Sequence, residues 1–140
     1  MQVTEIKTSI YRWKRSKPIR NGMYTYPDSG LNVVKIDTDE GISGIGFAGG
    51  VNDDGKVTHQ AINHFKQYVL GKDPVTTELI WDDMWQPKLV GRRGITTRAI
   101  SAIDIALWDI KGKMCNLPLY KSVSYTHLRA HETRHDLVCR

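Results

Sequence analysis

Apolar and polar positions alternate in three stretches near the start of the chain, a two-residue period typical of strands with one buried face. We expect these strands at residues 2–11, 31–38 and 42–48. A tight turn at 39–41, which ends on a glycine, joins the second strand to the third. Residues 12–30 contain two prolines, an Asn-Gly pair and a glycine, so we predict a long loop there. Strands joined in this way form an antiparallel meander.

The third expected strand places two glycines opposite two large apolar residues. Ile45 and Phe47 point to one side of the strand, and Gly44 and Gly46 point to the other. Because glycine has no side chain, the second side allows another element to approach closely.

The apolar spacing becomes helical after the flexible loop 49–55. A first helix is expected from Val57 until Gly71 stops it. A second is expected to open at the Asp73-Pro74 pair and to run up to Pro87. Three strands followed by three helices make the predicted fold class α+β.

The third and longest helix is expected to follow a basic loop at 91–94, with Thr96 or Thr97 as its N-cap. Its end is marked by Gly112 and Pro118. Apolar residues at helical spacing form its main stripe: Ala99, Ile103, Ala106, Leu107, Ile110 and Met114. Ala102, Ile105 and Trp108 widen that stripe, so this helix needs neighbours on most sides. Asp109 and Lys113 are spaced for an ion pair on its surface.

The segment AISAIDIALWDIKGK at residues 99–113, followed by LPLYK, resembles the last helix of the N-terminal domain of the enolase superfamily. Within that superfamily the chain is most similar to the mandelate racemase and muconate lactonizing enzyme group, and within the group to acid-sugar dehydratases. The resemblance covers residues 1–121. It implies an enolase-like N-terminal capping domain that lacks its (β/α)8 barrel, because the barrel would begin after Lys121.

The resemblance also implies a reaction. Enzymes of this superfamily abstract the proton next to a carboxylate, using a lysine or histidine base and Mg²⁺ to stabilise the enediolate. The base and the metal ligands lie on the barrel, so we assign no catalytic and no metal-binding residue to this chain. Its aspartates are expected to have structural or surface roles: Asp82, Asp83, Asp104 and Asp109. A sugar-acid dehydratase is favoured, with a racemase or cycloisomerase of the same superfamily as the alternative.

The family's N-terminal domain contributes a lid of two loops, which exclude water and contact the distal end of the substrate. By position these loops correspond to residues 19–27 and 49–54. An arginine and an amide suit a polyhydroxy carboxylate, and tyrosines suit the mixed surface of a sugar. The candidate substrate-capping residues are Arg20, Asn21, Tyr24, Tyr26, Gly49, Gly50 and Asn52. Arg92 and Arg93 are secondary candidates that could face the substrate or link helix and barrel through salt bridges.

The tail at residues 122–140 does not continue the family pattern, and we interpret it as non-native. Residues 123–132 match, residue for residue, the translation of a transposase-type sequencing adapter. The same tail contains His131, Glu132 and His135 in the H-E-x-x-H pattern of zinc proteases, which makes a zinc metalloprotease the competing reading. Only five residues follow His135, and no apolar helix surrounds the motif, so this reading is disfavoured.

Composition narrows the remaining function classes. The net charge of +5 is not gathered into a basic stripe with interleaved aromatic residues, so no nucleic-acid partner is expected. No apolar run is long enough to span a bilayer and no signal-peptide pattern is seen, so we expect a cytoplasmic protein without a membrane partner. The expected partners are a small sugar acid and the missing barrel, in a full-length homo-oligomer. A free-standing binding module made of the lid domain alone is a third possibility.

Overall fold

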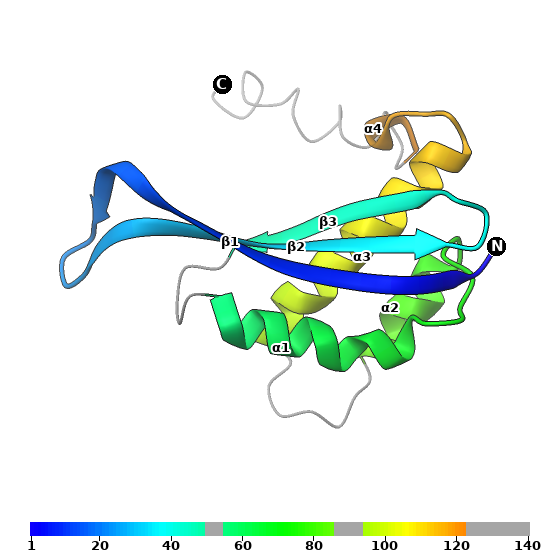
Figure 1. Ribbon diagram of the computed structural model, residues 1–140, viewed down its shortest axis with the longest axis horizontal. Coiled ribbons are helices and arrows are strands. Elements are labelled where there is room, and N and C mark those ends of the chain that lie inside the picture. The colour runs from blue at the N-terminus through cyan, green and yellow to red at the C-terminus, as the bar shows by residue number, and fades with distance from the viewer. Residues whose placement is uncertain (50–54, 86–93, 123–140) are drawn as a thin grey trace, which may run out of the picture.

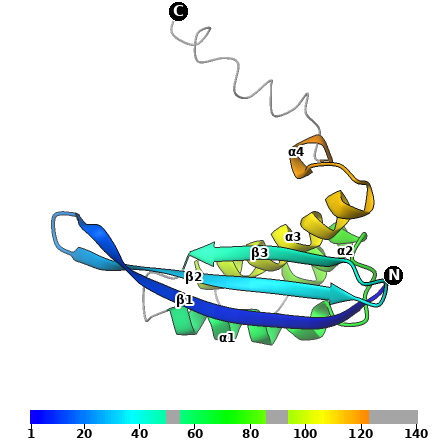
Figure 2. The same cartoon turned by 45° about the horizontal axis from the view of Figure 1, so that its top comes forward.

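The computed structural model describes residues 1–49, 55–85 and 94–122, and it has two layers. One layer is a three-stranded antiparallel sheet in the order β1-β2-β3, and helices cover one of its faces (Figures 1 and 2). The strands are β1 (Val3–Arg20), β2 (Thr25–Thr38) and β3 (Ser43–Gly49). The predicted α+β class and the antiparallel meander are therefore confirmed.

The helical layer follows the sheet in the sequence. Its elements are α1 (Lys56–Phe65), the 3-10 turn η2 (Lys66–Tyr68), α2 (Thr77–Trp85), α3 (Ile95–Met114) and the short α4 (Leu119–Ser122). Helix α3 packs on β3 and β2, while α1 contacts both β1 and α3, and α2 packs on α3. The long helix is thus the central element of the layer. No helix in the described ranges is long and apolar enough to cross a membrane.

The contact between β3 and α3 depends on the two glycines of the third strand. A Cβ atom built on Gly44 would collide with the backbone carbonyl oxygen of Ala106, and one built on Gly46 would collide with that of Ala102. The predicted close approach on the glycine side is confirmed. Ile45 and Phe47 point to the uncovered face, where 52% and 55% of their surfaces are exposed.

Two predicted helix starts were wrong. Helix α3 begins at Ile95 after Gly94, and its N-cap makes no side-chain hydrogen bond, so Thr96 and Thr97 lie inside the first turn. Helix α2 begins only at Thr77, because Asp73 forms a turn before it. The Asp73 carboxylate accepts a hydrogen bond from the backbone N–H of Val75 at 3.1 Å, which holds the chain in a turn rather than a helix.

The C-terminus of α3 ends in a Schellman motif that the sequence had not revealed. Asn116 has a positive φ of 50° and takes the left-handed position that glycine usually fills. The backbone N–H of Leu117 donates to the carbonyl oxygen of Gly112 at 2.9 Å, and that of Asn116 donates to Lys113 at 3.1 Å. Gly112 is therefore an interior helix residue, close to the returning chain at Leu117.

The predicted loop at residues 12–30 was also wrong, because β1 and β2 continue through it as a two-stranded ribbon. The prolines and glycines of this segment do not end the strands. Pro18 lies in an irregular stretch of the pairing, between Lys14 and Ile19. The ribbon has no third strand there, so each strand has a free edge on which proline removes no ladder hydrogen bond.

Candidate functional site

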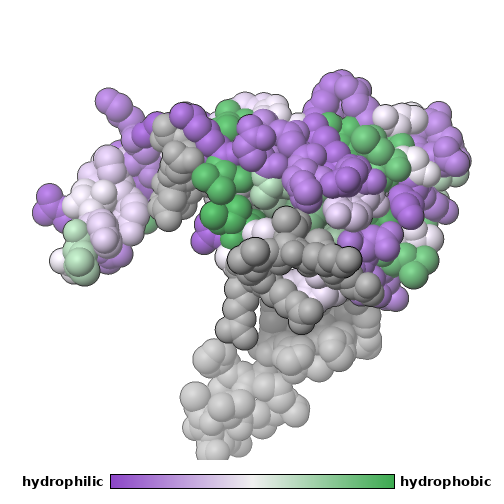
Figure 3. All heavy atoms as spheres, turned by 90° about the horizontal axis from the view of Figure 1, so that it is seen from below, coloured by the Kyte–Doolittle hydropathy of each residue, from purple (hydrophilic) through white to green (hydrophobic). Residues whose placement is uncertain are grey.

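A projecting arm, residues 12–30, carries the first group of substrate-capping candidates. Strand β3 ends at Gly49, which pairs with Leu31, and Leu31 in turn pairs with Tyr11. Beyond that row β1 and β2 pair only with each other, and the arm extends past the helical body (Figures 1 and 3). A two-stranded ribbon is only marginally stable in water by itself, so the arm suits a role in contacting something else.

The tip of the arm is held together by Asn21. Its side-chain oxygen accepts hydrogen bonds from the backbone N–H groups of Met23 at 3.3 Å and Tyr24 at 2.8 Å. Its backbone N–H donates to the carbonyl oxygen of Tyr24 at 3.0 Å. The side-chain nitrogen donates to the hydroxyl of Tyr26 at 3.4 Å. Asn21 is thus a turn-forming residue, and its amide oxygen is already engaged.

Arg20, Tyr24 and Tyr26 present the chemistry of the tip to solvent. Arg20 is exposed and faces Thr25 across the ribbon. The Tyr24 side chain is 59% exposed, and its ring centroid lies 6.4 Å from that of Tyr26 at a 44° tilt. The two neighbouring phenol rings form a surface with apolar faces and polar edges, and Arg20 pairs with Thr25, the residue between them. The structure therefore brings four of the predicted residues together at one tip.

Positive charge follows the whole arm. Its basic residues are Arg12, Lys14, Arg15, Lys17 and Arg20. Asp28 is its one acidic residue, so five positive charges minus one leave a net charge of +4. The Asp28 carboxylate pairs with Arg12 at 2.7 Å, and Arg15 Nε donates to the Asp28 carbonyl oxygen at 3.1 Å. The remaining cations give the arm a field that attracts anions.

Gly49, the second capping segment's first residue, lies at the root of the arm and not at its tip. Along β2, six residues separate its row, at Leu31, from Thr25, the partner of Arg20, which is about 20 Å at roughly 3.3 Å per residue. Nothing would lie within 4 Å of a Cβ atom on Gly49, so this position is open. The other candidates of the prediction, Gly50, Asn52, Arg92 and Arg93, lie outside the described residues, as do the tail's His131, Glu132 and His135.

Metal-binding side chains do not come together in the described part of the chain. No group of three or more His, Cys, Asp or Glu residues there is arranged to hold a metal ion. The two histidines of the described chain are both in α1, where His59 Nδ1 lies 3.3 Å from the Thr8 hydroxyl. The Mg²⁺ implied by the resemblance therefore does not fit these residues.

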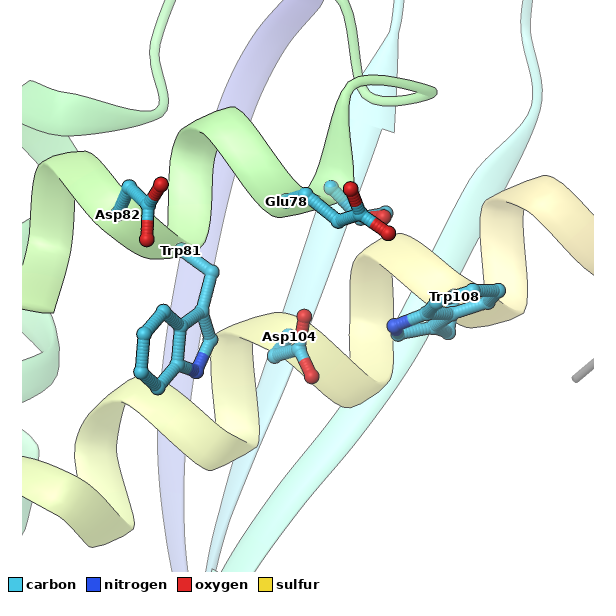
Figure 4. Close-up of a pocket in the computed structure, with 6 residues that line it drawn as sticks. Glu78, Trp81, Asp82, Asp104 and Trp108 are labelled. Carbon is cyan, nitrogen blue, oxygen red and sulfur yellow. The ribbon is translucent and has the colours of Figure 1, made fainter.

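Sequence reasoning missed two polar features inside the fold. Asn32 on β2 is fully buried beside Gly55, and neither atom of its side-chain amide has a hydrogen-bond partner. The sequence signal for this feature is an amide side chain among the apolar residues of 31–34. Asp104 on α3 is half-buried, and burial raises its carboxyl pKa above the ordinary value. It lines a hollow between α2 and α3 with two tryptophans (Figure 4).

The sequence of residues 3–123 matches the family described as the mandelate racemase / muconate lactonizing enzyme, N-terminal domain. The match covers the whole of both layers, from β1 through α4. The chain belongs to this family. The arm, the root at Gly49 and the α3 helix are therefore parts of a mandelate racemase/muconate lactonizing enzyme N-terminal domain, as the resemblance implied.

Relatives of this N-terminal domain include acid-sugar dehydratases. A D-galactonate dehydratase family member from Marinomonas sp. is 38% identical over 97 residues, which cover 69% of this chain and 24% of the relative. A 3,6-anhydro-alpha-L-galactonate cycloisomerase from Streptomyces coelicolor is 33% identical over 122 residues, covering 85% of this chain and 34% of the relative. The chain thus spans about a quarter to a third of the length of these relatives.

Solved structures share the fold. The crystal structure of L-talarate dehydratase from Polaromonas sp. JS666, complexed with Mg and L-glucarate, superposes with a TM-score of 0.80 at 26% identity. The superposition covers 88% of this chain and 35% of the dehydratase. This agreement places the described elements in the architecture of the enolase superfamily's N-terminal domain.

Proposed function

We propose that this chain is the N-terminal lid of a magnesium-dependent enzyme that abstracts the proton α to a carboxylate, and that the enzyme is an acid-sugar dehydratase. The family match over residues 3–123 carries the proposal, together with relatives named as dehydratases of galactonate and mannonate. Because the chain spans only a quarter to a third of such relatives, the 140-residue chain is proposed to be inactive without a barrel domain.

The arm's part in this function follows from its own residues. Its net charge of +4 draws a sugar carboxylate toward the site, an effect that weakens as salt rises. Arg20 is positioned to donate hydrogen bonds to oxygens at the distal end of the substrate, and Tyr24 and Tyr26 cover its carbon skeleton. Asn21 holds the turn that carries the two tyrosines, through hydrogen bonds to Tyr24 and Tyr26. Closure of such a tip also excludes water from the reaction.

Magnesium, when bound to the barrel, supplies electrostatic stabilisation of the enediolate. We propose that the ion and the catalytic base belong to the barrel, and the lack of a ligand set among the described residues supports this for the ion. The lid residues bind, orient and shield the substrate.

We propose further that residues 122–140 are not part of the natural domain. The family match ends at residue 123, close to the point where the adapter-like sequence starts, and this supports the proposal. The competing zinc-protease reading predicts one zinc ion per chain, lost on His131→Ala. We expect no stoichiometric zinc in the purified chain at neutral pH, and sub-micromolar zinc binding that requires His131 would contradict the adapter interpretation.

A cycloisomerase or racemase is the second candidate. It is favoured by one observation, the 33% identity to a cycloisomerase over 122 residues, a longer stretch than the dehydratase relative matches. Lid residues select the substrate and not the reaction type, so both candidates use the arm in the same way.

Joining residues 1–121 to the barrel of a dehydratase relative tests the function. The chimera is expected to dehydrate a sugar acid in the presence of Mg²⁺, whereas the 140-residue chain and the barrel alone are expected to show no turnover. Magnesium-dependent turnover by the 140-residue chain would contradict the proposal. Conversion of the sugar acid to an epimer or a cyclic isomer, without loss of water, would favour the second candidate.

A further inference from the structure

Asn32 on β2 carries a dry, unpaired amide inside the fold. It lies in the row Ile10–Asn32–Ala48, which is the last helix-facing row of the three-stranded sheet before the arm begins. Solvent reaches neither the oxygen nor the nitrogen of this amide, and neither atom has a hydrogen-bond partner among the described residues. Because buried polar groups are normally paired, the amide needs a physical explanation.

The amide packs against Gly55, the N-cap residue of α1. A Cβ atom on Gly55 would lie 2.9 Å from Asn32 Nδ2 and 3.5 Å from Asn32 Oδ1, so the amide occupies the space that a side chain would need. Gly55 also has a φ of 78°, a left-handed conformation that suits glycine. Helix α1 begins near the root of the arm (Figures 1 and 2). The unpaired amide therefore lies between the sheet and the start of this helix.

The first turn of α1 is held weakly by the described part of the chain. Its N-cap makes no side-chain hydrogen bond, and the turn contains no acidic residue that would interact favourably with the helix dipole. Lys56 is exposed, and Val57 is 45% exposed. The helix is anchored further along, where Ile62 and Phe65 are buried. The first turn can thus move away from the sheet while the rest of α1 stays in place.

We propose that Asn32 is a conformational device that favours local opening of the first turn of α1. In the closed arrangement the amide lacks the hydrogen bonds that water would give it, which raises the free energy of that arrangement. When Gly55 moves away, water reaches the amide and the free N–H groups of the first turn. An apolar residue at position 32 would remove this cost and keep the turn closed. The proposal goes beyond the lid function and does not depend on it, because it uses only Asn32 and the start of α1.

Hydrogen exchange on the 140-residue chain tests the opening. In an α-helix the backbone N–H groups of His59 and Gln60 bond to carbonyl oxygens of the first turn, so their exchange reports whether that turn opens. In the native chain we expect both to exchange about tenfold faster, or more, than Ile100 in α3. Asn32→Leu should slow exchange at His59 and Gln60 about tenfold. Unchanged exchange at these two positions would overturn the proposal.

Thermal melting with a matched control separates this effect from the preference of strands for apolar residues. Asn32→Leu should raise the midpoint by about 3–6 °C, because the closed arrangement no longer contains an unpaired amide. The control is Thr38→Val, on the same strand and the same face, where the threonine hydroxyl donates to the carbonyl oxygen of Ile42 at 2.7 Å. Thr38→Val should lower the midpoint, because it removes a paired donor, although valine is itself a good strand former.

A second apolar variant keeps the test decisive. Leucine is branched like asparagine but larger, so Asn32→Val provides a smaller replacement that should act in the same direction, and circular dichroism verifies the fold of each variant. A lower midpoint for both Asn32→Leu and Asn32→Val would mean that the amide has a stabilising partner in the folded chain, and would overturn the proposal. A higher midpoint for Thr38→Val as well would show that strand preference, and not release of α1, governs stability at these positions, and would overturn it too.

Discussion

The carboxylate of Asp109 on α3 accepts a hydrogen bond from the backbone N–H of Ile45 on β3 at 2.9 Å. The same oxygen pairs with Lys113 Nζ at 2.7 Å, and Lys113 in turn donates to the carbonyl oxygen of Ser43 at 2.8 Å. The ion pair expected on the helix surface is therefore confirmed, but it has a further role. It occupies backbone groups on the outer edge of β3, where another strand could otherwise add.

Asp109→Ala is expected to lower the free energy of unfolding by about 1–2 kcal/mol, because a backbone N–H loses a charged acceptor. Thermal melting should show a midpoint lower by about 5 °C or more. Asp109→Asn keeps an oxygen acceptor and should recover part of the loss. The control is Asp83→Ala, which breaks an exposed pair with Lys72 and should cost less than about 0.5 kcal/mol. Equal effects of the two alanine variants would contradict the anchoring role of Asp109.

Gly46→Ala is expected to destabilise the chain by about 1–3 kcal/mol or to prevent folding, because the new methyl group would meet the Ala102 carbonyl oxygen. The matched variant is Gly49→Ala in the same strand, where nothing lies within 4 Å of the added atom. That variant should change stability by less than about 0.5 kcal/mol. Urea unfolding of both variants measures the difference in the free energy of unfolding. An unchanged stability of Gly46→Ala would show that the sheet and α3 can move apart at little energetic cost.

Asp104 is expected to make stability depend on pH. Burial raises its carboxyl pKa above 3.8 in the folded chain, so the folded state binds this proton more readily than the unfolded state. The resulting stabilisation is present in acid and is lost as pH rises from the unfolded pKa through the raised folded one. Charged Asp104 therefore opposes folding at neutral pH, because burial penalises its ionised carboxylate.

Asp104→Asn should consequently raise the melting temperature at neutral pH and have little effect below pH 3.8. Asp83→Asn, at the exposed pair with Lys72, should not reproduce this pH-dependent gain. Melting curves recorded between acid and neutral pH provide the test. A melting temperature that falls at neutral pH in Asp104→Asn would mean that the ionised carboxylate has a stabilising partner.

Arg20→Ala or Tyr24→Ala in a complete enzyme with this N-terminal domain is expected to lower kcat/KM about tenfold or more, as the loss of a contact worth roughly 1–3 kcal/mol would. Stability should barely change, because both side chains are exposed at the tip of the arm. Lys17→Ala removes a charge elsewhere on the arm and should have a smaller effect. Normal kinetics with lower stability would assign Arg20 and Tyr24 to packing.

The isolated chain is expected to be marginally stable, to self-associate and to bind a hydrophobic dye. Large apolar side chains on the uncovered sheet face are half exposed, among them Ile45 and Phe47, and Leu119 near the C-terminus is 38% exposed. Light scattering after size exclusion and thermal melting test this. Phe47→Thr should reduce association. A sharp, reversible transition from a clean monomer would show that the domain is self-sufficient.

The sequence predicted those parts of the fold that depend on side-chain periodicity. The alternation in β1 to β3 and the stripe of α3 were sufficient for the meander, the helical layer and the close contact at Gly44. Ile105 and Trp108 of α3 are half-buried, while the outer sheet face is more open. Periodicity identifies an apolar face but not how far its neighbours cover it.

The arm and the hollow depend on contacts that periodicity does not encode. Residues 12–30 contain turn-forming residues, yet a ribbon with free edges tolerates proline, so local signals favoured the wrong structure. The candidates at the tip were found only through the family resemblance. Glu78, Asp82 and Asp104 come from two helices, and their proximity depends on the packing angle of α2 on α3, which the sequence does not state.

The glycines of β3 reverse the usual relation between residue type and tolerance to substitution. In most strands the large apolar positions resist mutation and the glycines are incidental. Here a library covering every substitution should leave Ile45 and Phe47 variable, because their side chains project from the uncovered face. Gly44 and Gly46 should reject every other amino acid, since even a methyl group meets the α3 backbone. Selection on this strand would then preserve the residues without side chains and allow the hydrophobic ones to drift.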